Sequence, residues 1–259
     1  MCSCRRNIMT IKLTGSGGAI KLTGTGGSIK FNSPGGGGGG IPVTNGLVVY
    51  LDAGNPASYP GSGTTWYDLS GNGQDATFAG SNPPTWNAAG YFDGFNTFDY
   101  MTLNNSPYSV IPVGNASRTI IAAVETPSVI SGLQHIFHYG SQAGQQSFGL
   151  GLGGGYLANH YWFGTTSITD PINSSTFYVF GVKYNDASSP RHAFTIDGVV
   201  GNIANDQPMN TGTGFNPNVG ARIAAGESWT YGGKIYSIAV YNRDLSDAEM
   251  QQVSSYLAV

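Results

Sequence analysis

Short hydrophobic runs follow one another from residue 46 to residue 241. GLVVYLDA (Gly46–Ala53) is an apolar run that ends in an acid, and RTIIAAVETP (Arg118–Pro127) is almost continuously apolar, as in the middle strand of a packed sheet. The series continues in QHIFHYGS, SFGLGLGGGYLANHYWFG, STFYVFGVKYN, RHAFTIDGVV and GKIYSIAVYNR. No helical pattern interrupts these runs, so they predict an all-β fold in which two antiparallel sheets form a sandwich.

Turn residues mark several connections. TIDGVV predicts a hairpin with a type I′ turn at Asp197 and Gly198. YFDGFNTFDYMTL (Tyr91–Leu103) predicts a strand, a turn and a second strand, and TWYDLSGNGQDATFAG predicts a turn followed by a short strand at Ala76–Phe78.

A helix is predicted only at the end of the chain. Ser246 and Glu249 have the spacing of a capping box, and Leu245 and Met250 have that of a hydrophobic staple. The apolar face of this short helix is expected to consist of Met250, Val253 and Leu257.

The first forty residues follow a different pattern, in which short strands recur every nine residues between Gly-rich turns. Their alternating positions are Ile11, Lys12, Leu13, Ile20, Lys21, Leu22, Ile29, Lys30 and Phe31. So few apolar side chains cannot offset the entropy lost on ordering a glycine-rich segment. We therefore expect these residues to anchor the chain by pairing with copies of themselves, with the body or with a foreign surface. The alternative is a flexible tail with accidental repetition.

These patterns divide the chain into three parts. We expect an anchoring arm over 1–34, a Gly-rich linker over 35–45 and a single domain over 46–259.

Charge is split between these parts. Residues 1–40 hold five basic and no acidic residues, and the rest holds six basic and fourteen acidic, so a net +5 precedes a net −8. An acidic body, with an arm that lacks interleaved aromatic residues, disfavours nucleic acid as a partner. Cys2 and Cys4 are too close for an ordinary disulfide, and no apolar segment predicts a signal peptide or a membrane span.

Five segments, taken in order, resemble the concanavalin A-like lectin/glucanase superfamily, and in particular its laminin-G-like branch. They are GLVVYLDAGN, TWYDLSGNGQDATF, YFDGFNTFDYMTL, FTIDGVV and GKIYSIAVYNRDLSDAEMQQVSSYL, and they span about residues 46–259. The resemblance implies a jelly-roll sandwich that serves adhesion and glycan or protein binding, sometimes with calcium. Such domains occur on secreted, cell-surface and tailed-bacteriophage virion proteins, and a minority are glycosidases.

The carboxylate pattern of the glucanases in this superfamily is missing. Glu125 and Glu227 have no second acid two or four residues away, and Glu249 is assigned to the helix cap. His135 and His138 are three apart in a predicted strand, so they face opposite sides unless a bulge intervenes. The sequence therefore predicts a protein that is not an enzyme.

Two groups of residues are candidates for binding. Hard oxygen donors near loops suggest a calcium site formed by Asp52, Asp68, Asn72 and Asp75. The favoured alternative is that Asp68 and Asn72 only satisfy backbone amides in a tight turn. Aromatic residues beside turns suggest a glycan site formed by Tyr161, Trp162, Trp229 and Tyr231, although a sandwich uses most aromatic residues as core.

Together these observations predict a virion structural protein, a capsid decoration or a head or tail fibre, located on the particle surface. The arm would bind other virion proteins or sister copies, for which a trimer is one possibility, and the domain would adhere to glycans. A secreted or cell-surface carbohydrate-binding module is the first alternative, and a degenerate glycoside hydrolase is the second. No cofactor is expected to be required, apart from the calcium already considered.

Overall fold

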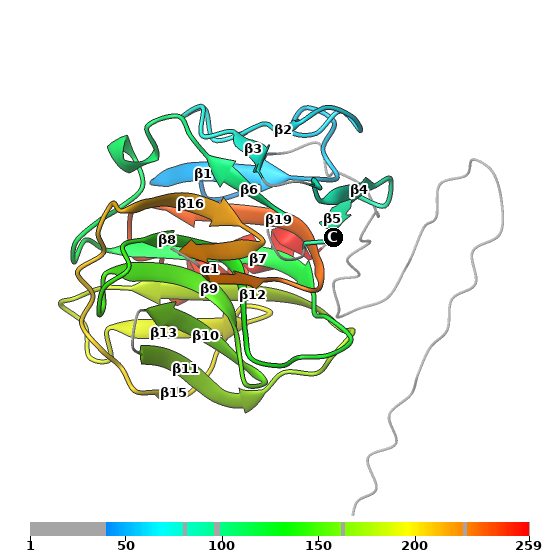
Figure 1. Cartoon of the computed structure of the whole chain (residues 1–259). Helices are drawn as coiled ribbons and strands as arrows, with labels where there is room; N and C mark the ends of the chain where they lie inside the picture. Colours follow the sequence, from blue (N-terminus) through cyan, green and yellow to red (C-terminus); the bar gives the residue numbers. More distant parts are fainter. Residues whose placement is uncertain (1–39, 80–81, 96–98, 162–163, 225–226, 259) are drawn as a thin grey trace, which may run out of the picture. The chain divides into compact units, whose positions relative to one another are not determined.

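The computed structural model describes residues 40–79, 82–95, 99–161, 164–224 and 227–258 (Figure 1). Two large sheets, called A and B below, account for most of this part of the chain, and their neighbouring strands pair antiparallel. The predicted all-β sandwich is confirmed. The predicted arm lies outside the described residues.

Sheet A has the order β14-β13-β12-β7-β19-β5-β4, and β1 also pairs with β19. Its strands are β1 (Leu47–Asp52), β4 (Thr85–Asn87), β5 (Tyr91–Asp93), β7 (Arg118–Glu125), β12 (Phe177–Tyr184), β13 (His192–Ile196), β14 (Val199–Val200) and β19 (Lys234–Tyr241).

Sheet B has the order β15-β11-β10-β9-β8-β16-β6-β3-β2. Its strands are β2 (Thr65–Trp66), β3 (Ala76–Ala79), β6 (Tyr100–Leu103), β8 (Leu133–Gly140), β9 (Ser147–Gly153), β10 (Tyr156–Tyr161), β11 (Gly164–Pro171), β15 (Ile203–Ala204) and β16 (Phe215–Val219). A separate hairpin of β17 (Ala221–Ala224) and β18 (Glu227–Thr230) follows β16, and a 3-10 turn η1 spans Pro107–Ser109.

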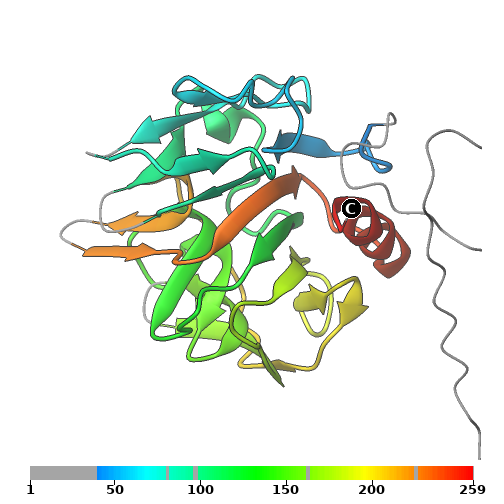
Figure 2. The ribbon, with the colours of Figure 1, turned by 90° about the vertical axis from the view of Figure 1, so that its right-hand side faces the viewer.

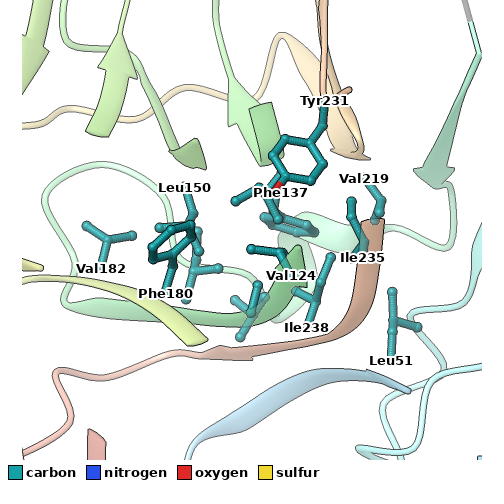
Figure 3. Packing of buried hydrophobic residues seen from close by; sticks show 14 of the residues in the cluster. Leu51, Val124, Phe137, Leu150, Phe180, Val182, Val219, Tyr231, Ile235 and Ile238 are labelled. Carbon is teal, nitrogen blue, oxygen red and sulfur yellow. The ribbon is translucent and has the colours of Figure 1, made fainter. Parts of the chain in front are cut away.

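The main hydrophobic core takes side chains from both sheets (Figure 3). Val124 and Phe180 come from sheet A, whereas Phe137, Leu150 and Val219 come from sheet B. All five are fully buried. The inner faces of the two sheets therefore form the main core of the sandwich.

Strand β7 is apolar on both faces for a structural reason. Val124 and Ile120 lie in the main core, while Ile121 and Ala123 lie in a second cluster on the outer side of sheet A. Helix α1 (Asp247–Leu257) contributes Met250 and other residues to that second cluster. The continuous apolar run of β7 is thus explained by burial on both sides, as the sequence predicts.

Helix α1, red in Figure 2, lies against the outer face of sheet A. The Ser246 hydroxyl accepts from the Glu249 backbone N–H, and the Glu249 carboxylate accepts from the Ser246 N–H, so the predicted capping box is confirmed. Both staple residues, Leu245 and Met250, are fully buried. Within the described ranges, no helix is long and apolar enough to cross a membrane.

The folded body begins before the predicted boundary at residue 46. Ile41 and Val43 are buried in the second cluster. The Tyr241 hydroxyl donates to the Val43 carbonyl at 3.0 Å, and Arg243 Nε donates to the Asn45 carbonyl at 2.8 Å. Residues 41–45 therefore belong to the body and not to a linker. The preceding glycines suggested a linker, but burial of the two apolar side chains orders this segment against the body.

The predicted hairpin at Asp197 and Gly198 is present between β13 and β14. Both turn residues have positive φ, 53° and 81°, as a type I′ turn requires.

Candidate functional site

The outer face of sheet B is polar, in contrast to the helix-covered outer face of sheet A. In β6, Met101 and Leu103 are buried in the main core, so Tyr100 and Thr102 point away from it. In β16, Asn218 points away from the core in the same manner, since the residue after it is a core valine. Alternation along these two strands therefore places hydroxyl, amide and aromatic groups on one surface.

An open cleft of about 350 Å³ lies on this surface. Its lining combines two aromatic rings with amide and hydroxyl groups and includes no charged side chain: Tyr100, Thr102, Gly214, Phe215, Asn216, Asn218 and Ile223. We call it the β6–β16 cleft. Neutral hydrogen-bonding groups beside aromatic rings can bind a ligand that has both hydroxyl groups and an apolar face.

Hydrogen bonds hold the polar wall of the β6–β16 cleft in place. Asn216 Nδ2 donates to Asn104 Oδ1 at 2.9 Å, and Asn104 Nδ2 donates to Thr77 Oγ1 at 3.1 Å. The Tyr108 hydroxyl donates to the Phe215 carbonyl. These bonds join β3, β16 and η1, so the Asn216 amide is oriented before any ligand arrives.

A cluster of histidines lies next to the cleft on the same face. The ring centroids of His135 and His138 are 4.9 Å apart, and those of His135 and His160 are 5.3 Å apart. His138 is the cross-strand partner of Asn218, which lines the cleft. We call His135, His138 and His160 the histidine cluster.

The histidine cluster corrects the expectation that His135 and His138 face opposite sides. The pairing of β8 with β9 shifts register between His135 and Phe137, which marks a bulge. One extra residue restores the same orientation after three positions.

Glycines of β9 make room for the histidine rings. A Cβ atom on Gly149 would lie 3.0 Å from Cδ2 of His138, and one on Gly153 would collide with the His160 ring. Alternating Gly and large apolar residues from Phe148 to Gly153 thus give this part of β9 a core face of side chains and an outer face of glycines.

The three imidazoles differ in their hydrogen bonds. His160 Nε2 lies 3.1 Å from the Leu152 carbonyl and therefore donates to it, while Nδ1 accepts from the Thr165 hydroxyl at 2.8 Å. Nε2 of His135 and Nε2 of His138 are buried and have no hydrogen-bond partner within the described part of the chain. Two polar atoms are thus buried on this face without a partner among the described residues.

Hairpin β17–β18 adds a cation to the cluster. The Arg222 guanidinium lies 4.6 Å from the ring centroid of Trp229, its cross-strand partner, and Arg222 is only 5% exposed. Burial lowers the pKa of His138 to about 3 and that of His160 to about 4, and the nearby Arg222 charge acts in the same direction. Burial, the other two histidines and Arg222 hold the pKa of His135 well below its usual range. The histidine cluster is therefore neutral at pH 7.

Two of the four predicted glycan residues, Tyr161 and Tyr231, are buried and do not lie on the surface. Tyr161 is 6% exposed and lies in the core, and Tyr231 is fully buried, with its hydroxyl donating to the Glu125 carbonyl at 2.9 Å. Neither ring has a face open to a sugar, because residues beside turns in a sandwich still point inward on alternate positions. Trp162 lies outside the described residues. Of the four, Trp229 lies half-buried beside the histidine cluster.

The predicted calcium residues are engaged in a turn. Asp68 accepts from the backbone N–H groups of Tyr50, Ser70 and Gln74, and Asp75 accepts from the N–H of Asp68. Asn72 Nδ2 donates to the Leu47 carbonyl and to the Ser70 hydroxyl.

Asp52 accepts from the Gly54 N–H and from the Tyr50 hydroxyl. Within the ranges that the structure describes, no three acids, histidines or cysteines are grouped so that they could hold a metal ion. Hydrogen bonds within the protein therefore account for the presence of these four polar side chains without a metal ion. Calcium binding stays a prediction. The predicted anchoring residues, Ile11 to Phe31, lie outside the described residues.

Comparison by sequence finds no matching protein family and no matching curated protein. Comparison of structures finds a Trypanosoma rangeli sialidase in complex with sialic acid, at a TM-score of 0.56 and 16% identity, with 84% of this chain and 34% of that chain covered. A mutant of the same sialidase that displays trans-sialidase activity has a TM-score of 0.55 and 18% identity, with 85% and 34% covered.

The CBM40 domain of a Ruminococcus gnavus IT-sialidase bound to α2,3-sialyllactose is 19% identical over 60% of this chain and 92% of that one, at a TM-score of 0.48. The chain spans about a third of the length of the T. rangeli sialidase chains. At these identities the likeness to the sialidases establishes the fold.

The prediction that the protein is not an enzyme is wrong, because it was drawn from the missing glucanase motif alone. Structures with a similar fold include sialidases, which are enzymes. One missing carboxylate pattern excludes one catalytic mechanism and not catalysis as such.

Proposed function

We propose that the protein binds carbohydrate at the β6–β16 cleft. The observation that carries this proposal is the cleft lining, where Tyr100 and Phe215 lie beside the hydroxyl of Thr102 and the amides of Asn216 and Asn218. A sugar offers C–H faces that pack on aromatic rings and hydroxyls that bond to amides. The cleft has a volume of about 350 Å³ and is open to solvent, so a ligand bound there would keep one side in water.

A glycan array tests the proposal. The full-length protein is applied at pH 7.5 to bacterial polysaccharides and to neutral and sialylated oligosaccharides, and every retained glycan is then followed for cleavage by mass spectrometry. We expect selective retention of at least one class of glycan. Retention of none, or retention that is unchanged in Tyr100→Ala, would contradict binding at the cleft.

We assign the domain to the laminin-G-like branch of the concanavalin A-like superfamily. The support is the order of five sequence segments, from GLVVYLDAGN to GKIYSIAVYNRDLSDAEMQQVSSYL. Adhesion through the carbohydrate site agrees with that assignment.

We further infer that the domain is displayed on a virion, with residues 1–40 binding other virion proteins of the capsid or tail, or sister copies. The support lies in the nine-residue repeat and in the basic arm before an acidic body. Deleting residues 1–40 is expected to leave a folded body that binds glycan and no longer joins the particle. Incorporation of the truncated protein into particles would contradict the display role, and a secreted or cell-surface module would then be the better interpretation.

A further inference from the structure

The histidine cluster and Arg222 form one buried group of titratable and cationic side chains. His135, His138, His160 and Arg222 are each at most 6% exposed. Among the residues that the structure describes, the charged groups that act on the three histidines are the histidines themselves and Arg222. Of the other described side chains around them, β11 contributes the Thr165 hydroxyl, β16 an Asn218 amide and β9 only glycines.

Such a group tolerates one positive charge and not several. At neutral pH the imidazoles are uncharged, and Arg222 is the cation among them. Protonation of an imidazole would bury a second positive charge next to the first, where low dielectric strengthens the repulsion. Arg222 lies on a two-stranded hairpin that pairs with neither large sheet, so displacing it breaks no strand pairing within sheet A or sheet B.

Movement of Arg222 would change the β6–β16 cleft. Ile223 follows Arg222 on β17 and is one of the residues that line the cleft. Asn218, another lining residue, is the cross-strand partner of His138. The histidine cluster and the cleft therefore share two direct structural connections.

We infer that the histidine cluster regulates the carbohydrate site by pH: acid protonates the cluster, displaces Arg222 and Ile223, and removes one wall of the cleft. Carbohydrate is then held at neutral pH and released in acid. This inference rests on the proposed function. Each histidine that is neutral in the closed state and exposed in the open state favours opening by up to about tenfold per pH unit below about 6.5.

Hydrogen exchange of the full-length protein tests the displacement without any carbohydrate. The opening equilibrium at the Ala221–Ile223 amides, corrected for intrinsic exchange, is measured at pH 7 and pH 5 and compared with that of β7. We expect opening at Ala221–Ile223 to be more frequent than opening of β7 at both pH values and to increase at least tenfold from pH 7 to pH 5. No increase, or opening at Ala221–Ile223 that is as rare as that of β7 at both pH values, would overturn the inference.

Two variants separate the cluster from a general acid effect. His138→Gln is expected to reduce the acid response at Ala221–Ile223, whereas His192→Gln, which replaces the one histidine outside the cluster, is expected to keep it. Loss of the response in both variants to the same extent would overturn the inference. If His138→Gln does not fold, imidazole NMR of the wild-type protein decides: ordinary titration of His138 near pH 6.5 with the Ala221–Ile223 amides still protected would overturn it.

The glycan array, repeated at pH 5, distinguishes the two proposals. Retention at pH 7.5 that falls at least tenfold at pH 5 supports both. Equal retention at the two pH values would overturn the regulation and leave the carbohydrate site standing, while no retention at pH 7.5 would overturn the proposed function itself.

Discussion

The rings of His135 and His138 lie 4.9 Å apart on one face of sheet B, although a regular strand would place them on opposite faces. The bulge between His135 and Phe137 is the cause. It brings both imidazoles together with His160 on the same face as the polar β6–β16 cleft.

Stability is expected to fall as the pH is lowered from about 6.5 to 5. The folded-state pKa values of the three clustered histidines lie below the unfolded value, so the unfolded state binds more protons in this range. Proton binding therefore stabilises the unfolded state relative to the folded state. Each such histidine lowers the free energy of unfolding by up to about 1.4 kcal/mol per pH unit. His192, whose pKa burial also lowers, acts in the same direction.

Urea unfolding at pH 7.5, 6 and 5 measures this slope. Carboxylates with lowered pKa values, such as Asp206, lose their contribution only at lower pH and do not disturb the window. His138→Gln should flatten the slope by about 1.4 kcal/mol per pH unit. A slope that is the same in wild-type protein and variant would show that His138 is not held neutral by the fold.

Gly151→Ala is expected to destabilise the protein by about 1–3 kcal/mol. An added Cβ would collide with the Gln134 carbonyl of β8, and backbone in the middle of a sheet cannot move aside cheaply. Gly40→Ala is the matched control, because nothing lies within 4 Å of a Cβ at that position. Equal melting temperatures of the two variants would contradict the close approach of β8 and β9.

Ser246→Ala is expected to cost about 1 kcal/mol of unfolding free energy, because the first turn of α1 loses its cap. Ser254, on the buried face of the same helix, gives a matched control: its hydroxyl is buried and has no hydrogen-bond partner among the described residues. Ser254→Ala should therefore cost nothing or stabilise slightly in the same urea titration. A larger loss from Ser254→Ala than from Ser246→Ala would contradict the role of the cap.

Arg118→Met is expected to cost more than about 3 kcal/mol, because several buried acceptors lose their donor at roughly 1–3 kcal/mol each. The fully buried Arg118 donates to the Ala116, Pro112 and Gly114 carbonyls and to the Thr211 hydroxyl.

Arg191→Met controls for loss of a positive charge. The Arg191 side chain is 38% exposed and makes surface ion pairs, so its removal should cost less than about 1 kcal/mol. Thermal unfolding of both variants compares them, and similar melting temperatures would contradict the structural role of Arg118.

Features that depend on neighbouring residues could be predicted from the sequence. The capping box at Ser246 and Glu249 and the turn at Asp197 and Gly198 need only local spacing, and both are confirmed. Burial of Ile41 could not be predicted in this way, because the cluster that it joins includes residues far along the chain, such as Leu245 and Leu257.

The candidate site was harder to predict. The alternation in YMTL at Tyr100–Leu103 already places Tyr100 and Thr102 opposite two core residues, so a signal for the cleft was present. It could not be recognised without knowing which strand face meets the core. The histidine cluster depends on a bulge and on the pairing of β8 with β9, which the one-dimensional pattern does not contain.

The most direct test of carbohydrate binding at the β6–β16 cleft compares two tyrosine variants. Tyr100 lines the cleft, whereas Tyr67 is 47% exposed and is not among the lining residues. Affinity for the glycan retained most strongly on the array is measured by calorimetry at pH 7.5 for Tyr100→Ala and Tyr67→Ala. We predict a loss of about tenfold or more for Tyr100→Ala, as for an aromatic contact residue, and wild-type affinity for Tyr67→Ala. Equal affinities of both variants and the wild-type protein would contradict the cleft as the carbohydrate site.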